Sequence, residues 1–86
     1  MDQITRKIIR AAYTVSNTLG AGFLEKVYEN ALTHELRKSG LHVEQQHPVK
    51  VYYDKVVVGD YHADLAVEGK VIIELKAAKG IDDVHL

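Results

Sequence analysis

Apolar residues recur at helical spacing in the first quarter of the chain. They fall three or four positions apart and so line one side of a helix. Gly20 follows the last of them, and glycine commonly ends a helix because it tolerates a left-handed backbone. The pattern predicts an amphipathic helix ending near residue 19, with its apolar side formed by Ile4, Ile8, Ala11 or Ala12, Val15 and Leu19.

A second helical pattern follows after Ala21-Gly22, which is predicted to be the hinge between two helices. This helix should end at Ser39-Gly40. Its predicted apolar side consists of Leu24, Val27, Tyr28, Ala31, Leu32 and Leu36.

Beyond Gly40 the pattern changes to β-branched and aromatic residues, which suit a pleated sheet. Asp54-Lys55 is predicted to be the turn of one hairpin. Glu68-Gly69 should be the turn of a second hairpin, joining Tyr61–Val67 to Val71–Ala77. The predicted fold is α/β of the α+β kind, with two N-terminal helices packed on a three-stranded antiparallel meander.

The last hairpin contains charged residues within apolar strands. Glu74 and Lys76 interrupt one strand, and their two-residue spacing places both on one face. Asp64 lies among small and apolar residues of the partner strand. Charges rarely occur in such runs unless they are paired or bind a metal. These three residues are therefore candidates for a functional site.

The turn decides whether the two acids meet. A two-residue loop at Glu68-Gly69 would set Asp64 opposite Ile73, with the carboxylates on different faces. A type I turn with a bulge at left-handed Gly69 adds one residue, so that Val67 pairs with Val71. Asp64 then lies opposite Glu74. The glycine favours this second register.

Two carboxylates in that register would repel one another unless a cation lies between them. All-oxygen ligands suit Mg²⁺ or Mn²⁺, which bind through one or two carboxylates in sites for phosphate-bearing substrates. Lys76, on the same face, would orient or deprotonate the attacking water and stabilise charge on a phosphoryl transition state. The alternative is that the acids are surface residues and Lys76 merely neutralises one of them.

Glu25 is a further candidate ligand from the second helix. It lies at the margin of the apolar arc, so its carboxylate is expected to face the sheet, as a direct or indirect partner of the metal. Glu35 maps onto the same arc. Solvation at the helix ends would equally explain both acids.

Composition limits the remaining possibilities. The chain has 86 residues, which fits a single domain spanning residues 1–86, and it has no cysteine for a disulfide or a thiolate metal site. A cytoplasmic location is the default, and no membrane-spanning stretch is apparent. A formal charge of -1 gives no overall attraction to nucleic acid. A local basic patch, or simply two solvated helix faces, would be formed by Arg6, Lys7, Arg10, Arg37 and Lys38.

Three blocks of residues resemble a known family in this order: Gly22-Phe-Leu-Glu25-Lys-Val-Tyr28, Gly59-Asp-Tyr-His-Ala-Asp64 and Glu74-Leu-Lys76. Together they are similar to the GxxExxY family of bacterial proteins, which is placed in the PD-(D/E)XK nuclease-like superfamily. The resemblance implies that Glu25, Asp64 and Glu74 are metal ligands and that Lys76 is catalytic. By the same analogy, the backbone carbonyl of Leu75 would be a further ligand.

Family members continue beyond the Glu-x-Lys strand into a helix and another strand, so a truncated restriction-endonuclease-like core lacking these elements is expected. The apolar side of Val71–Ala77 would then be bare, and the strand would be a sheet edge, which predicts a homodimer. The sequence therefore leads to the hypothesis that the protein is a Mg²⁺-dependent nuclease acting on DNA. The alternative is a non-catalytic binding or assembly module that retains the nuclease fold.

Overall fold

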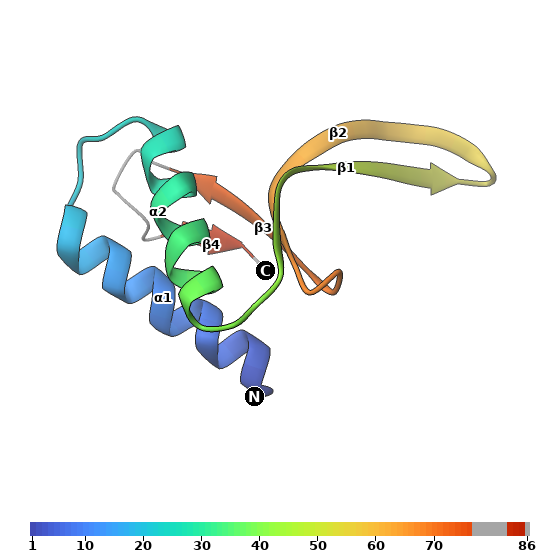
Figure 1. The fold of residues 1–86 in the computed structure, drawn as a ribbon. Coiled ribbons are helices and arrows are strands. Elements are labelled where there is room, and N and C mark those ends of the chain that lie inside the picture. The colour runs from blue at the N-terminus through green and yellow to red at the C-terminus, as the bar shows by residue number, and fades with distance from the viewer. Residues whose placement is uncertain (77–82, 86) are drawn as a thin grey trace.

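The computed structural model describes residues 1–76 and 83–85 and has two layers, one of helices and one of strands (Figure 1). Helices α1 (Gln3–Leu19) and α2 (Glu25–Lys38) precede strands β1 (Val43–Tyr53), β2 (Val56–Val67), β3 (Val71–Lys76) and β4 (Asp83–His85). The strands form one antiparallel sheet in the order β1-β2-β3-β4. The predicted meander is confirmed, and the short β4 extends it.

The first helix has the predicted apolar side. Ile8, Ala11, Ala12 and Val15 are buried, and Ile4 and Leu19 pack against them. Asp2 caps the helix by accepting a hydrogen bond from the Thr5 N–H at 2.7 Å, and this bond lowers the pKa of Asp2. No helix in the described part of the chain has the length and apolarity needed to cross a membrane.

The second helix faces the sheet with a different set of residues from the one predicted. Tyr28, Leu32 and Leu36 are buried as expected, but Leu24 and Val27 are exposed. Glu29 and Thr33 are buried in their place. Helix α2 thus packs its Tyr28–Leu36 stripe on β1, β2 and β3, and α1 packs against α2.

Strand β3 has its apolar side covered, in contrast to the sequence-based expectation. Ile73 and Leu75 are buried in the core beneath the helices, and Val71 packs against that core. The strand is not an edge, because β4 pairs with it. The bare apolar strand from which a homodimer was predicted is therefore absent over Val71–Lys76, and Ala77 lies outside the described residues.

The hairpin of β1 and β2 extends away from the body of the molecule as an arm (Figure 1). Its turn at Asp54-Lys55 is the predicted one, with Tyr53 paired to Val56 and both turn residues at positive φ. Near the body, the hairpin contributes Val43, Leu65 and Val67 to the core. Further out, the hairpin extends beyond the helices (Figure 1).

Candidate functional site

The predicted register of the last hairpin is confirmed. Val67 pairs with Val71 and Leu65 with Ile73, so the next position brings Asp64 opposite Glu74. The turn differs in detail, because both Glu68 and Gly69 have positive φ, of 54° and 63°, rather than Gly69 alone. The loop still adds the residue that puts both acids on one face.

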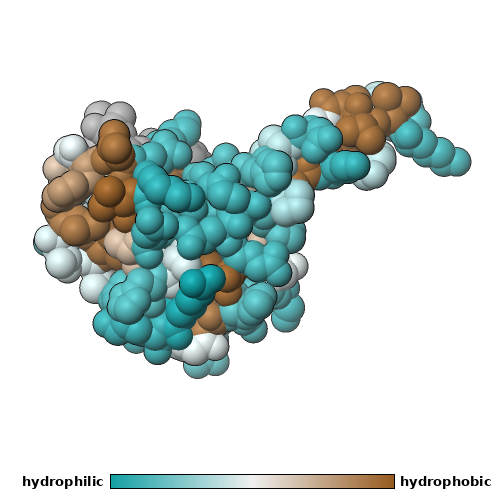
Figure 2. Space-filling view, turned by 45° about the horizontal axis from the view of Figure 1, so that its top comes forward, coloured by the Kyte–Doolittle hydropathy of each residue, from teal (hydrophilic) through white to brown (hydrophobic). Residues whose placement is uncertain are grey.

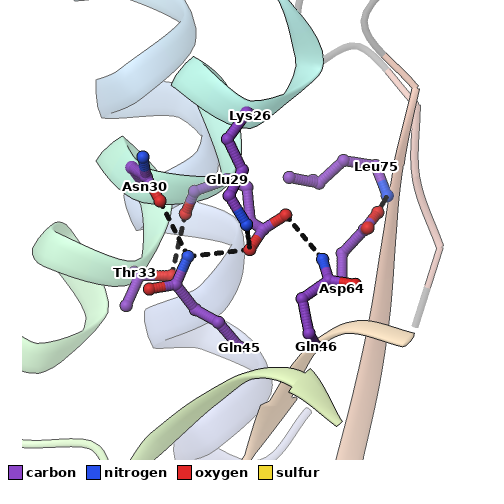
Figure 3. A network of polar contacts seen from close by, with 8 residues as sticks. All are labelled: Lys26, Glu29, Asn30, Thr33, Gln45, Gln46, Asp64 and Leu75. Atoms are coloured by element: carbon purple, nitrogen blue, oxygen red, sulfur yellow. Dashed lines mark hydrogen bonds and ion pairs between the residues drawn. The ribbon is translucent and has the colours of Figure 1, made fainter. Parts of the chain in front are cut away.

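Asp64 lies where regular pairing between β2 and β3 stops. The ladder ends at Leu65 and Ile73, and the Asp64 Oδ2 accepts a hydrogen bond from the Leu75 N–H at 2.7 Å (Figure 3). The side chain thus replaces a backbone partner at the point where the strands separate. No hydrogen bond within residues 1–76 engages Oδ1. One oxygen is fixed while the other is left for a ligand.

Glu74 carries a buried oxygen without a partner. Its Oε1 is inaccessible to solvent and accepts no hydrogen bond from the residues that the structure describes. A buried polar atom without a partner costs roughly 1–3 kcal/mol, and more if charged. Continuing the β2–β3 register by one position places Glu74 across from Asp64, so a second carboxylate lies on the same side of the sheet. A cation bound between them would give the buried Oε1 a partner.

Lys76 ends β3, two residues beyond Glu74, and is exposed. Alternation along the strand places it on the side of Glu74, while Leu75 between them enters the core. Within residues 1–76, no cluster of three or more histidine or acidic side chains is close enough to hold a metal. The described site therefore offers two carboxylates, a set that Mg²⁺ accepts because it retains several waters.

Glu25 does not occupy the position predicted for it. It lies in the first turn of α2 with its side chain exposed. One helical turn later, Glu29 is 2% exposed and points toward the strands (Figure 3). The helix acid facing the sheet is thus Glu29, which corrects the sequence-based choice. The sequence gives one sign of this orientation, because Glu29 lies between Tyr28 and Leu32, which are both on the buried side of α2.

Glu29 joins α2 to β1 through both carboxylate oxygens. Lys26 and Gln45 donate to Oε2 at 3.0 and 2.7 Å, and Gln46 donates to Oε1 at 2.9 Å. The Thr33 hydroxyl donates to the Glu29 backbone carbonyl at 2.8 Å. Three donors compensate the burial of this charge.

Gln46 connects this network to the strand of Asp64. Its neighbours Gln45 and His47 pair with Leu65 and Ala63, so Gln46 is opposite Asp64. It has a φ of 53°, a left-handed conformation that costs roughly 1–2 kcal/mol for a residue with a Cβ. The hydrogen bond to Glu29 offsets part of that cost. Backbone strain of this kind is concentrated at functional sites.

The residues of the Gly-x-x-Glu-x-x-Tyr motif hold the loop between the helices. Gly22 has a φ of 106°, which a side chain would not tolerate well. The Tyr28 hydroxyl donates to the Gly20 carbonyl at 2.7 Å and accepts from the Phe23 N–H at 3.1 Å. The glycine and tyrosine of the motif are thus structural in this chain.

The predicted basic patch is only partly available for a ligand. Lys7 donates to the Ser39 carbonyl, Arg37 to the Val43 carbonyl, and Lys38 pairs with Glu35. A shallow hollow along α1 is lined by Arg6, Arg10 and Tyr13, among others. These two arginines remain candidates for contact with an anion.

One of three comparisons with known proteins identifies a family for this chain. A search of curated proteins and a search of solved structures each returned no match. The sequence pattern of the PD-(D/E)XK nuclease superfamily, however, matches residues 2–86. That match spans both helices, the acid pair of β2 and β3, and Lys76. The chain therefore belongs to the PD-(D/E)XK nuclease superfamily.

Proposed function

We propose that this chain is a Mg²⁺- or Mn²⁺-dependent nuclease domain that hydrolyses phosphodiester bonds of DNA. The observation that carries the proposal is the buried, unpartnered Oε1 of Glu74 opposite the Asp64 carboxylate. Oxygen donors without cysteine or histidine match hard divalent cations. The superfamily match supports a nuclease-like reaction.

In this proposal Asp64, Glu74 and the Leu75 carbonyl would hold the ion. The bound ion would supply Lewis-acid stabilisation of charge on the scissile phosphate. The Leu75 N–H keeps the Asp64 carboxylate in place through its 2.7 Å hydrogen bond. Lys76 places an ammonium on the same side, where it stabilises negative charge in the transition state and orients the attacking water.

The helix acid of the proposed site is Glu29, acting as a positioning residue. It fixes Gln46 in its left-handed conformation and thereby sets β1 against the strand of Asp64. We also propose membership of the GxxExxY family, in which the present Gly22 and Tyr28 form the interhelical loop. Glu25 is then a helix N-terminal acid, favoured there by the helix dipole.

DNA binding would depend on local charge, because the chain as a whole carries -1. Arg6 and Arg10 follow one face of α1 at a four-residue spacing, and Tyr13 continues it with an exposed ring. These residues are proposed as contacts to the phosphate backbone.

A second candidate function is a binding or assembly module that keeps the fold without catalysis. The observation in its favour is that both oxygens of Glu29 are taken by donors of its own chain. An acid whose two oxygens already accept these hydrogen bonds holds α2 and β1 together without a metal ion. Such a module would have no need of Mg²⁺.

Thermal unfolding with and without Mg²⁺ or Mn²⁺ separates the two candidates. A cation that binds only the folded state raises stability by about 2.7 kcal/mol at a hundredfold excess over its Kd. Asp64→Asn should lose this response, whereas Asp60→Asn, an exposed acid on the same strand, should keep it. A response that persists in Asp64→Asn contradicts the assignment.

Cleavage is tested on supercoiled and single-stranded DNA, with RNA of matched length as the control substrate. Lys76→Ala should reduce the rate by roughly 10²–10³, the usual effect of removing one transition-state donor. Binding of Mg²⁺ should persist in that variant. Metal binding without cleavage of any substrate would contradict the proposed hydrolysis. The absence of both metal binding and cleavage would favour the second candidate.

A further inference from the structure

Gln46 has a left-handed backbone at a place where the chain makes no turn. Within the described part of the chain, four residues other than glycine have positive φ, and three of them, Asp54, Lys55 and Glu68, lie in hairpin turns. Gln46 instead lies inside β1, with strand residues on both sides. Such conformations persist only where the surrounding structure enforces them, and they are concentrated at functional sites.

The pairing of β1 with β2 is interrupted at the same place. The residues on either side pair regularly, but Gln46 and Asp64 between them do not. On the other side of β2, Asp64 lies one residue beyond the last regular pair with β3, which is Leu65 with Ile73. Asp64 therefore lacks a regular strand partner on both sides, and side chains set its surroundings.

The Gln46 side chain is anchored at one end. Its Nε2 donates to the Glu29 Oε1 at 2.9 Å, and Lys26 and Gln45 hold the other oxygen of that buried carboxylate. The amide carbonyl oxygen of Gln46, Oε1, accepts no hydrogen bond from the residues that the structure describes. Because an amide group is planar, anchoring Nε2 restricts where Oε1 can point. Figure 3 shows this side chain between Glu29 and Asp64.

Gln46 thus adds a neutral acceptor to two carboxylates that also have free oxygens. Asp64 Oδ1 and Glu74 Oε1 accept no hydrogen bond from the described residues either. Acceptors without a donor among them are complementary to a hydrated cation, whose waters donate hydrogen bonds outward. The base of the arm is mostly hydrophilic on the side seen in Figure 2, as expected of a surface that a hydrated ion can reach.

We propose that Gln46 Oε1 accepts a hydrogen bond from a water molecule in the hydration shell of the divalent cation held by Asp64 and Glu74. This inference rests on the proposed function. Mg²⁺ keeps several waters when it binds through one or two carboxylates, and outer partners of this kind orient what surrounds a metal. Gln46 is thus a positioning residue, and its left-handed backbone lets one side chain reach both Glu29 and this water.

A purely structural role would make Gln46 equivalent to Gln45. Both amides donate to the Glu29 carboxylate, Gln45 to Oε2 at 2.7 Å and Gln46 to Oε1 at 2.9 Å. Their places in the sheet differ, because Gln45 pairs with Leu65, a core residue, whereas Gln46 is opposite Asp64. Gln45→Ala is therefore the matched control, since it weakens the same contact between α2 and β1 without changing the residue opposite Asp64.

The test measures Mn²⁺ binding to the full chain by electron paramagnetic resonance, which detects the free ion and requires no cleavage. Gln46→Gly should bind Mn²⁺ about 10- to 100-fold more weakly than the wild type, the usual effect of losing an outer partner of a metal site. Gln45→Ala should keep the wild-type Kd.

Thermal unfolding without metal supplies a second readout. Gln46→Gly should be at least as stable as Gln45→Ala, because glycine adopts the left-handed backbone without strain while both variants lose one hydrogen bond to Glu29. Gln46→Glu keeps an acceptor oxygen but cannot donate to Glu29. It should be less stable than Gln46→Gly without metal and yet bind Mn²⁺ more tightly, so that stability and metal affinity change in opposite directions.

Two outcomes would overturn this inference and leave the nuclease proposal standing. One is a Gln46→Gly variant with the Mn²⁺ affinity of the wild type. The other is equal weakening in Gln46→Gly and Gln45→Ala, which would show that Gln46 acts only through Glu29. A wild type that binds no Mn²⁺ would instead contradict the metal site of the proposed function, and this inference with it. Far-UV circular dichroism checks that each variant is folded.

Discussion

The body of the molecule and its arm are built from the same kind of sequence but differ in burial. In the body, Ile8, Leu32 and Leu65 are fully buried between the helices and the sheet. In the arm, Val56 and Val58, which lie on the same strand β2 as Leu65, are 60% and 61% exposed. Both regions have apolar residues at strand or helix spacing. What separates them is whether a second layer is present.

This difference shows that an apolar pattern predicts the secondary structure and the face, while burial depends on a partner. The proximal part of β2 meets α2, and its Leu65 and Val67 join the core. The distal part extends past the end of that helix (Figure 1). Stability should therefore come from the body.

The largest expected effect is a loss of unfolding free energy when a core residue, but not an arm residue, is truncated. Leu32→Ala should lower the free energy of unfolding by about 2–5 kcal/mol, because it leaves a cavity in the only helix layer of the described fold. Val58→Ala in the arm should change it by less than about 0.5 kcal/mol in dilute solution. Chemical denaturation measures both. Equal losses would mean that the arm shares the core's stability.

The second effect concerns the polar contacts that join the arm's base to α2. Glu29→Ala should destabilise the fold by roughly 2–4 kcal/mol, because Gln45 and Gln46 lose a charged acceptor in a buried place. Glu25→Ala, one turn earlier and exposed, should cost no more than about 0.5 kcal/mol. The same denaturation experiment compares them. A larger loss for Glu25→Ala would restore the sequence-based choice.

A smaller effect is expected in the loop between the helices. Tyr28→Phe keeps the buried ring but removes the hydroxyl that bonds the Gly20 carbonyl and the Phe23 N–H. The expected loss is about 1–2 kcal/mol. Amide exchange should be faster at Phe23 while the core of α2 remains protected. Uniform loss of protection would instead show that this loop and the core unfold together.

The smallest effect lies on the exposed part of β1, where Glu44 accepts hydrogen bonds from His47 at 2.9 Å and His42 at 3.4 Å. These bonds, His47 foremost, lower the pKa of Glu44 below its ordinary 4.5. A carboxyl with a lowered pKa stabilises the fold above the unfolded value, and this contribution is lost as the pH falls through the lowered pKa. In chemical denaturation at a series of pH values, wild type should therefore be slightly more stable than Glu44→Gln near neutral pH, and the gap should close as the pH falls from 4.5 through the lowered pKa.

The sequence predicted most of the fold because its signals are local. Both helix stops, the Asp54-Lys55 turn and the bulge at Glu68-Gly69 follow from glycine and turn chemistry at single positions. The last of these fixed the Asp64–Glu74 register. The short β4 was missed because three residues carry little pattern.

The helix acid was chosen wrongly because a helical wheel locates a face only relative to its neighbours. Leu24 and Val27 widened the predicted apolar arc toward Glu25, yet both are exposed near the start of α2. The sheet contacts the stripe from Tyr28 to Leu36, which brings Glu29 and Thr33 inward. The sequence of a helix does not show at which residue its contact with the sheet begins.

The sequence alone determined the helices, the strands and the pairing that opposes Asp64 and Glu74, because each depends on residues near one another in the chain. The tertiary structure decided which helix acid meets the sheet, that Gln46 adopts a left-handed conformation beside Asp64, and that half of the hairpin lies beyond the helices. These outcomes depend on how much of the sheet the helix layer covers. That overlap is set by packing between distant segments, and no periodicity within one segment encodes it.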